Sequence, residues 1–171
     1  GGQKATLNIV PLFNFRGAGA TSERQELNFE MNLADQVLTL VPAGFEEMSI
    51  KFFASKGTYI DRKLRPTSMA TPNYLIEENH YYEFDNRNGS RGLDNHYTPY
   101  DLVVELEPHT TTKFYLKCTV EELDERDGFE IVKNYRERAN QLMDQSGYED
   151  ALALNFVQAA DHFVVKREST G

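Results

Sequence analysis

The side chains best suited to chemistry gather between residues 84 and 101, in the stretch FDNRNGSRGLDNHYTPYD. Three carboxylates lie in or beside it: Asp85, Asp94 and Asp101. A glycosidase needs two carboxyl groups, one to protonate the leaving oxygen and one to act as base or nucleophile. Because acidic residues are abundant throughout the chain, the sequence singles out no pair. A self-contained glycosidase would also need a deep cleft in a small domain.

The same stretch has the composition of a sugar-binding surface. Tyrosine rings can stack on a sugar ring, while Asn, Asp and Arg side chains can bond its hydroxyl groups. The candidate sugar-facing residues are Arg91, Asp94, Tyr97 and Tyr100. The alternative is a long loop that packs on itself, with Arg91 paired to a nearby aspartate.

The histidines do not predict a metal site. They stand at positions 80, 96, 109 and 162, and none has another histidine at the i+2 or i+4 spacing that brings two ligands to one metal. The sequence also lacks a glycine-rich phosphate loop and a Gly-x-Ser-x-Gly turn. We therefore expect no metal and no cofactor.

The charge balance argues against two classes of partner. The chain has 18 basic and 27 acidic residues, which gives a formal net charge of −9. It offers no positive field to phosphate groups, so we expect neither nucleic acid nor a membrane surface as a partner. The single cysteine, Cys118, excludes an internal disulfide, and its alternating surroundings predict a small buried residue.

Up to about residue 120, apolar and polar residues alternate, as they do in strands with one face on a core. In residues 27–33, Leu27, Phe29, Met31 and Leu33 alternate with polar neighbours. Turn-forming residues separate such runs, for example at 42–44 and 107–109. With no helical pattern between them, about seven to nine short strands predict a mainly β fold, an antiparallel β-sandwich over residues 1–120.

Residues 121–171 change to a helical period. In 121–145, Ile131, Tyr135, Ala139 and Leu142 form one apolar stripe, and acidic residues precede it as they do at helix starts. A second helix over 151–163 carries an apolar stripe of Leu152, Phe156, Ala160 and Phe163. We expect this stripe to be buried against another part of the protein or a second copy of the chain, so a homodimer through 151–163 is one expectation.

Three segments, in matching order and spacing, resemble one family. LNIVPLFNFR (7–16) is similar to a strand followed by Pro-Leu and Phe-Arg in the N-terminal domain of glycogen debranching enzymes of the bacterial and archaeal type. YYEFDNRNGSRGLDNHYTPYDLVVELEPH (81–109) is similar to a Tyr-containing strand, an Arg-Gly loop and a final strand of that domain. NFVQAADHFVVKR (155–167) resembles the helix that opens the catalytic domain of those enzymes.

The resemblance implies a β-sandwich that packs on a helical (α/α)-barrel, and the barrel hydrolyses α-1,6-glucosidic branch points. Residues 121–171 would then be a helical linker and the start of that catalytic domain, with the rest of the barrel absent from this chain. The chain itself would hold no catalytic residue and be inactive alone. Its partners would be the barrel and an α-glucan, the latter bound by a loop with Arg91, Asp94, Tyr97 and Tyr100. The family's role in storage-glucan metabolism implies a cytoplasmic location.

An independent carbohydrate-binding module is the alternative from another class of protein. Such modules present exposed aromatic platforms, and four tyrosines could supply one here: Tyr81, Tyr82, Tyr97 and Tyr100. Measurable binding of maltooligosaccharide by the chain alone would favour this alternative.

Overall fold

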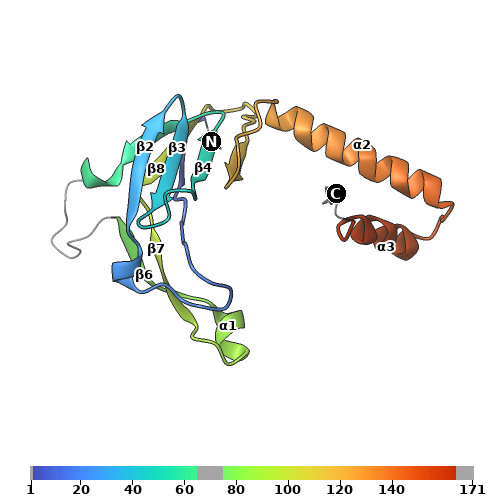
Figure 1. The fold of residues 1–171 in the computed structure, drawn as a ribbon. Coiled ribbons are helices and arrows are strands. Elements are labelled where there is room, and N and C mark those ends of the chain that lie inside the picture. The colour runs from blue at the N-terminus through green and yellow to red at the C-terminus, as the bar shows by residue number, and fades with distance from the viewer. Residues whose placement is uncertain (1, 65–74, 165–171) are drawn as a thin grey trace. The chain divides into compact units, whose positions relative to one another are not determined.

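The computed structural model describes residues 2–64 and 75–164, which belong to two compact units, 1–123 and 124–171 (Figure 1). The sequence analysis placed this boundary at residue 120. Within the described residues the first unit holds nine strands: β1 (Ala5–Ile9), β2 (Phe29–Ala34), β3 (Val37–Pro42), β4 (Ile50–Ala54), β5 (Thr58–Asp61), β6 (Ile76–Tyr81), β7 (Leu93–Tyr97), β8 (Tyr100–Leu106) and β9 (Leu116–Thr119). It also holds the 3-10 helices η1 (Arg24–Glu26) and η2 (Arg62–Leu64) and the short helix α1 (Glu83–Arg87).

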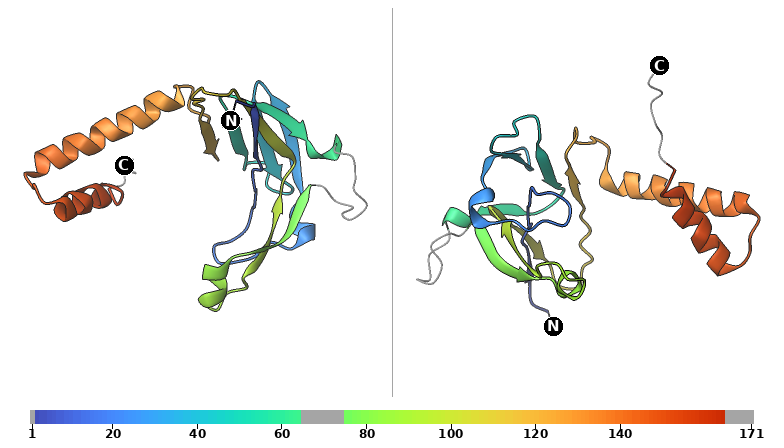
Figure 2. Two further views of the ribbon diagram at one scale, coloured as in Figure 1. Left: turned by 180° about the vertical axis from the view of Figure 1, so that it is seen from behind. Right: turned by 60° about the horizontal axis from the view of Figure 1, so that its bottom comes forward.

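The strands form three antiparallel sheets with the orders β2-β3-β4-β9, β1-β8-β5 and β6-β7. In the first sheet β2, β3 and β4 pair in sequence order, with Leu38 of β3 opposite Phe52 of β4, and β9 adds to the free edge of β4. In the second sheet β1 pairs instead with β8, so that Ala5 lies opposite Leu106. The β6-β7 ribbon extends from the sheets and carries α1 at its end (Figure 2).

The core lies where the inward faces of the sheets meet. Leu38 and Leu40 of β3 and Leu102 and Val104 of β8 are fully buried. An edge-to-face contact between Phe52 of β4 and Tyr59 of β5, 6.4 Å between ring centroids, joins the two layers. Each fully buried leucine contributes on the order of 2 kcal/mol of hydrophobic free energy. The prediction of a mainly β, antiparallel fold followed by helices is confirmed.

The second unit contains two helices, α2 (Gly128–Ser146) and α3 (Ala151–Asp161). Each begins at an aspartate whose side chain accepts hydrogen bonds from backbone N–H groups of the first turn: Asp127 for α2 and Asp150 for α3. Gly147 ends α2 in the left-handed conformation, with φ of 71°. The predicted helical stretches are thus confirmed. No helix in the described parts of the chain is long and apolar enough to cross a membrane.

Two local expectations are wrong. The stretch 84–101 is not one long loop, because it contains α1, β7 and the start of β8, and Tyr82 N donates to Gly92 O at 2.7 Å where the β6-β7 ribbon ends. Cys118 is exposed rather than buried, because β9 is an edge strand of its sheet.

Candidate functional site

Two pockets lie on either side of the segment Arg16–Thr21, and they share Arg16, Ala20 and Thr21. The larger, which we call the aromatic pocket, has a volume of about 800 Å³. It is lined by Phe15, Arg16, Gly17, Ala20, Thr21, Gln25, Glu26, Asn28, Pro42, Ala43 and Phe45. The smaller, the α1 pocket, has a volume of about 230 Å³. It is lined by Arg16, Gly19, Ala20, Thr21, Tyr82, Asp85, Ser90, Arg91 and Asp94.

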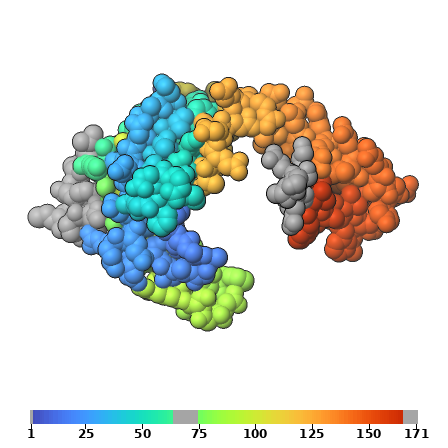
Figure 3. All heavy atoms as spheres, in the orientation of Figure 1, coloured from blue at the N-terminus to red at the C-terminus, as the bar shows by residue number. Residues whose placement is uncertain are grey.

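The α1 pocket forms where two segments distant in sequence meet. In Figure 3 the yellow-green atoms of α1 and its flanking residues lie against the blue atoms of residues 13–22, which we call the N-terminal segment. Phe13 joins that segment to β7 through two backbone hydrogen bonds with Tyr97, both 2.9 Å. The N-terminal segment therefore covers β7, which explains why Asp94, Asn95, His96 and Tyr97 are all buried.

Asp94 anchors this covering segment. Its side chain is 3% exposed. Its Oδ1 accepts hydrogen bonds from Ser22 N at 2.7 Å and from Asn95 N at 2.9 Å. Its Oδ2 accepts one from Asn14 Nδ2 at 3.0 Å and forms an ion pair with Arg16 Nε, also 3.0 Å. Both oxygens are thus engaged, so the arrangement suits Asp94 to holding the pocket wall rather than to transferring a proton.

Asn95 extends the same network to β6. Its Nδ2 donates to Ser22 O at 2.8 Å, and its Oδ1 accepts from Asn79 N at 2.9 Å. Asn79 has a φ of 60° and lies at an irregularity in the β6-β7 pairing between Glu77 and His80. An irregularity of this kind re-aims side chains, and here it accompanies the backbone contact with Asn95.

Arg91 is half exposed in the α1 pocket and forms an ion pair with Glu23. The sequence suggests a nearby aspartate as its partner, whereas in the structure the partner is a glutamate 68 residues away. Glu23 also caps η1, since its backbone N–H donates to Glu26 Oε2 at 2.7 Å. Arg91 thereby connects the loop between α1 and β7 to η1, whose Glu26 lines the aromatic pocket.

Tyr82, which lines the α1 pocket, belongs to a cluster with His96 and His80. The Tyr82 hydroxyl is 2.7 Å from Nε2 of His96, and the rings of His96 and His80 are 5.1 Å apart between centroids. Burial lowers the pKa of His96, with a smaller opposing effect from the nearby Asp94 carboxylate. The His96 imidazole is therefore held in its neutral form more strongly than a solvated one.

The two tyrosines of the expected sugar-facing loop lie on strands. Tyr97 is 5% exposed, stacks on Phe29 with 4.9 Å between centroids, and donates its hydroxyl to Met31 Sδ at 3.5 Å. Tyr100 is partly buried and packs edge-to-face on Tyr59 at 6.1 Å. Burial raises the pKa of both hydroxyls. The pockets bring Arg91 and Asp94 together, while both tyrosine rings pack with the core aromatic residues.

The remaining candidate acids, Asp101 and Asp85, differ in their exposure to solvent. Asp101 on β8 is 0% exposed, and its Oδ1 lies 3.6 Å from Arg62 Nε. Asp85 on α1 is exposed and lines the α1 pocket. No group of three or more His, Cys, Asp or Glu side chains that could hold a metal ion occurs among the described residues.

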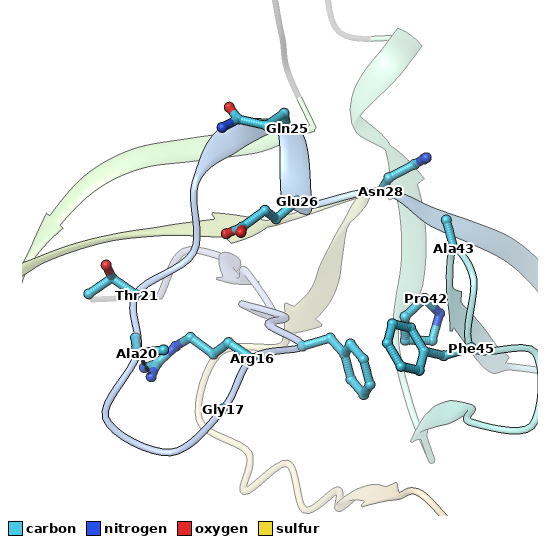
Figure 4. Close-up of a pocket in the computed structure, with 11 residues that line it drawn as sticks. Arg16, Gly17, Ala20, Thr21, Gln25, Glu26, Asn28, Pro42, Ala43 and Phe45 are labelled. Atoms are coloured by element: carbon cyan, nitrogen blue, oxygen red, sulfur yellow. Dashed lines mark hydrogen bonds between the residues drawn. The ribbon is translucent and has the colours of Figure 1, made fainter.

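The sequence alone does not predict the aromatic pocket. Phe45 is 47% exposed, and its ring lies 4.9 Å from that of Phe15 between centroids. In Figure 4 Phe45 and Pro42 close one side of this pocket, while Glu26 and Arg16 reach it from opposite sides. The turn signal Pro42-Ala43-Gly44 directly before an aromatic residue was visible in the sequence. The position of Phe15 beside it was not.

The first unit is thus a mainly β domain with two polar-rimmed pockets. The sequence profile of one family, described as glycogen debranching enzyme N terminal, matches residues 1–113. This match spans most of the chain, so the chain belongs to that family, and the resemblance of the motifs at 7–16 and 81–109 to its N-terminal domain is confirmed. The motif at 155–167 lies outside the matched residues, and its resemblance stays a prediction. No curated protein and no solved structure matches the chain.

Proposed function

We propose that this chain is the non-catalytic β-sandwich region of a glycogen-debranching glycoside hydrolase. In this role it supports an α-1,6-glucosidase barrel and lines part of the glucan cleft. The observation that carries the proposal is the state of the three candidate acids. Asp94 is committed to four polar contacts and Asp101 is fully buried, which leaves Asp85 as the exposed carboxylate of the three. A glycosidase needs two carboxyl groups that reach the substrate.

The adjoining pockets support a contact with glucan. Arg91, Ser90 and Tyr82 in the α1 pocket present a guanidinium and hydroxyl groups. The aromatic pocket adds an apolar wall beside the shared Arg16. Sugar hydroxyls are both donors and acceptors, and a mixed surface of this kind satisfies them without requiring a charged ligand.

The helical unit supports a contact with a further helical domain. Leu152 is 62% exposed and Phe156 and Phe163 are more exposed still, although all three are large and apolar. Removing such area from water is worth about 25 cal/mol for each Å². We propose that the catalytic barrel covers this stripe. A homodimer through residues 151–163 is the alternative occupant, and it would appear as a concentration-dependent mass in sedimentation experiments.

The test of the non-catalytic role is an activity assay on the chain 1–171. We expect no release of reducing sugar from glycogen limit dextrin above the buffer control. Hydrolysis that rises with protein concentration and is lost in Asp85→Asn would contradict the proposal, because Asp85 is the exposed carboxylate among the candidates. Denatured chain serves as the control for contaminating glucosidase.

A second function, the independent carbohydrate-binding module, is favoured by one observation. Tyr81 and Tyr82 are exposed at the end of β6 and just beyond it. The two functions differ in what the barrel adds to binding. An independent module reaches its full glucan affinity alone, whereas a cleft-lining region gains affinity when the barrel is present.

A further inference from the structure

From the aromatic pocket we infer a saccharide subsite in which Phe45 is the stacking ring for one sugar residue. Glu26 and Arg16 bind hydroxyl groups of a neighbouring residue of the same saccharide. This inference rests on the proposed function and deepens it, because it assigns the sugar contact to residues outside the stretch 84–101.

The Phe45 ring is exposed on a fixed backbone. The backbone N–H of Phe45 donates a hydrogen bond to Pro42 O at 3.0 Å, which closes a β-turn in which Gly44 has a φ of 82°. Its carbonyl accepts from Met48 N at 2.9 Å. A positive φ at the third residue of such a turn favours glycine, so the turn is specified by the sequence. An exposed aromatic ring whose backbone is held on both sides loses little conformational entropy when a ligand covers it.

Phe15 completes the apolar wall. Its ring is tilted by 58° against that of Phe45, with 4.9 Å between centroids. This contact restrains the Phe45 side chain while its other surface stays open to solvent. The C–H face of a pyranose ring is apolar and can pack on such a surface, because both then leave water.

The polar walls are also held in place. Glu26 Oε2 accepts a hydrogen bond from Glu23 N at 2.7 Å, which orients the carboxylate. Arg16 is fixed by its 3.0 Å ion pair with Asp94. Figure 4 shows the charged ends of both side chains directed away from Phe45, with the Arg16 guanidinium beside Ala20, whose carbonyl accepts a hydrogen bond from its Nη1. Charged groups make the stronger hydrogen bonds to hydroxyls, as acceptor at Glu26 and as donor at Arg16.

The combination selects a neutral, polyhydroxylated ring. A purely apolar ligand would leave Glu26 and Arg16 without the water that solvates them, which is costly. An anionic ligand would meet Glu26 and a chain with a net charge of −9. The volume of about 800 Å³ lies within the usual range for small-molecule sites.

The experiment is a titration of ¹⁵N-labelled chain 1–171 with maltoheptaose, followed by amide NMR shifts. We expect the largest shifts at Phe45, Glu26 and Gly17. Shifts confined to Ser90 and Arg91 would overturn the subsite while leaving the proposed glucan contact intact. The absence of shifts at millimolar maltoheptaose would overturn the subsite, whereas the non-catalytic role is judged by the activity assay.

Substitutions then test the stacking ring itself. We expect Phe45→Ala to raise the Kd for maltoheptaose at least about tenfold, equivalent to ~1.4 kcal/mol of binding free energy, and Phe45→Trp to retain binding. The matched control is Phe84→Ala, because Phe84 on α1 is 77% exposed and lines neither pocket. Unchanged affinity in Phe45→Ala would overturn the inference, as would an equal loss in Phe84→Ala. An unaltered amide spectrum away from residue 45 verifies that each variant is folded.

Discussion

The two units of the chain keep their structure by different means. In the β unit, residues from several strands reach complete burial, and the buried side chains of Asp94 and Asn95 on β7 form hydrogen bonds with Ser22. In the helical unit, Gly128 and Ala139 are the buried residues of α2, and α3 has none among its described residues. There each helix has a side-chain cap, and the Arg138–Asp161 ion pair at 2.6 Å and the Tyr135–His162 contact at 2.6 Å join α2 to the end of α3.

The difference shows which unit can be stable by itself. A core of buried leucine, valine and aromatic side chains offsets the entropy lost on folding, while surface ion pairs and caps contribute about 1 kcal/mol or less each. The β unit therefore has its own source of stability. The helical unit needs a further apolar surface for comparable stability, and the exposed stripe on α3 is where that surface would pack.

The largest contrast is expected from removing one leucine in each unit. Leu38→Ala should lower the free energy of unfolding by about 3 kcal/mol, because it leaves a cavity in the core. Leu152→Ala should change it by less than about 0.5 kcal/mol, because that side chain is mostly in water. Urea unfolding of both variants measures the difference. An equal loss in both would mean that the helical unit has a core of its own.

A somewhat smaller effect is expected at Asp94. Asp94→Ala should cost about 2–3 kcal/mol, because Arg16, Asn14 and the Ser22 N–H lose their shared acceptor. Hydrogen exchange should become faster at the Ser22 amide, which reports release of the pocket wall. Asp85→Ala, an exposed aspartate of the same pocket, is the control and should change stability by less than about 0.5 kcal/mol. Slow exchange at Ser22 in Asp94→Ala would show that other contacts hold the segment.

The smallest effect is a pH dependence at His96. Because its pKa is lowered in the folded protein, the unfolded chain binds a proton more readily just below the ordinary pKa of about 6.5. Stability should therefore fall as the pH drops below about 6.5. The groups around the ring are Asp94, His80, Arg16 and Tyr82. In urea unfolding at several pH values, His96→Gln should lose less stability than wild type over this range; parallel curves would assign the dependence to other groups.

The alternation of apolar and polar residues and the helix-capping residues were sufficient to predict most of the strands and helices. Leu38 and Leu40 are buried on β3 with less buried neighbours between them, as a strand with one face on a core requires. The acidic start of α2 corresponds to the Asp127 cap. These features are local, so residues a few positions apart determine them.

The site was harder to predict because distant residues make it. β7 is buried on both sides, and its interior is polar, so neither alternation nor hydrophobicity marks Asp94-Asn95-His96 as a strand. Hydrogen bonds from Asn14 and Ser22, more than 70 residues earlier in the chain, to the Asp94 carboxylate offset the cost of burying it. The aromatic pocket likewise depends on Phe15 meeting Phe45. Contacts of this kind between distant residues are determined by the tertiary fold, and they produce no periodic pattern in the sequence.

The pairing of β1 with β8 has a consequence during synthesis of the chain. Ala5 pairs with Leu106, so β1 is synthesised about 100 residues before the strand that pairs with it. At about 5–20 residues per second, roughly 5–20 s pass before the complementary strand exists. During that interval the TLNI segment is an unpaired strand that can associate with other nascent chains. A chaperone that binds short apolar segments could bind there well before either pocket has formed.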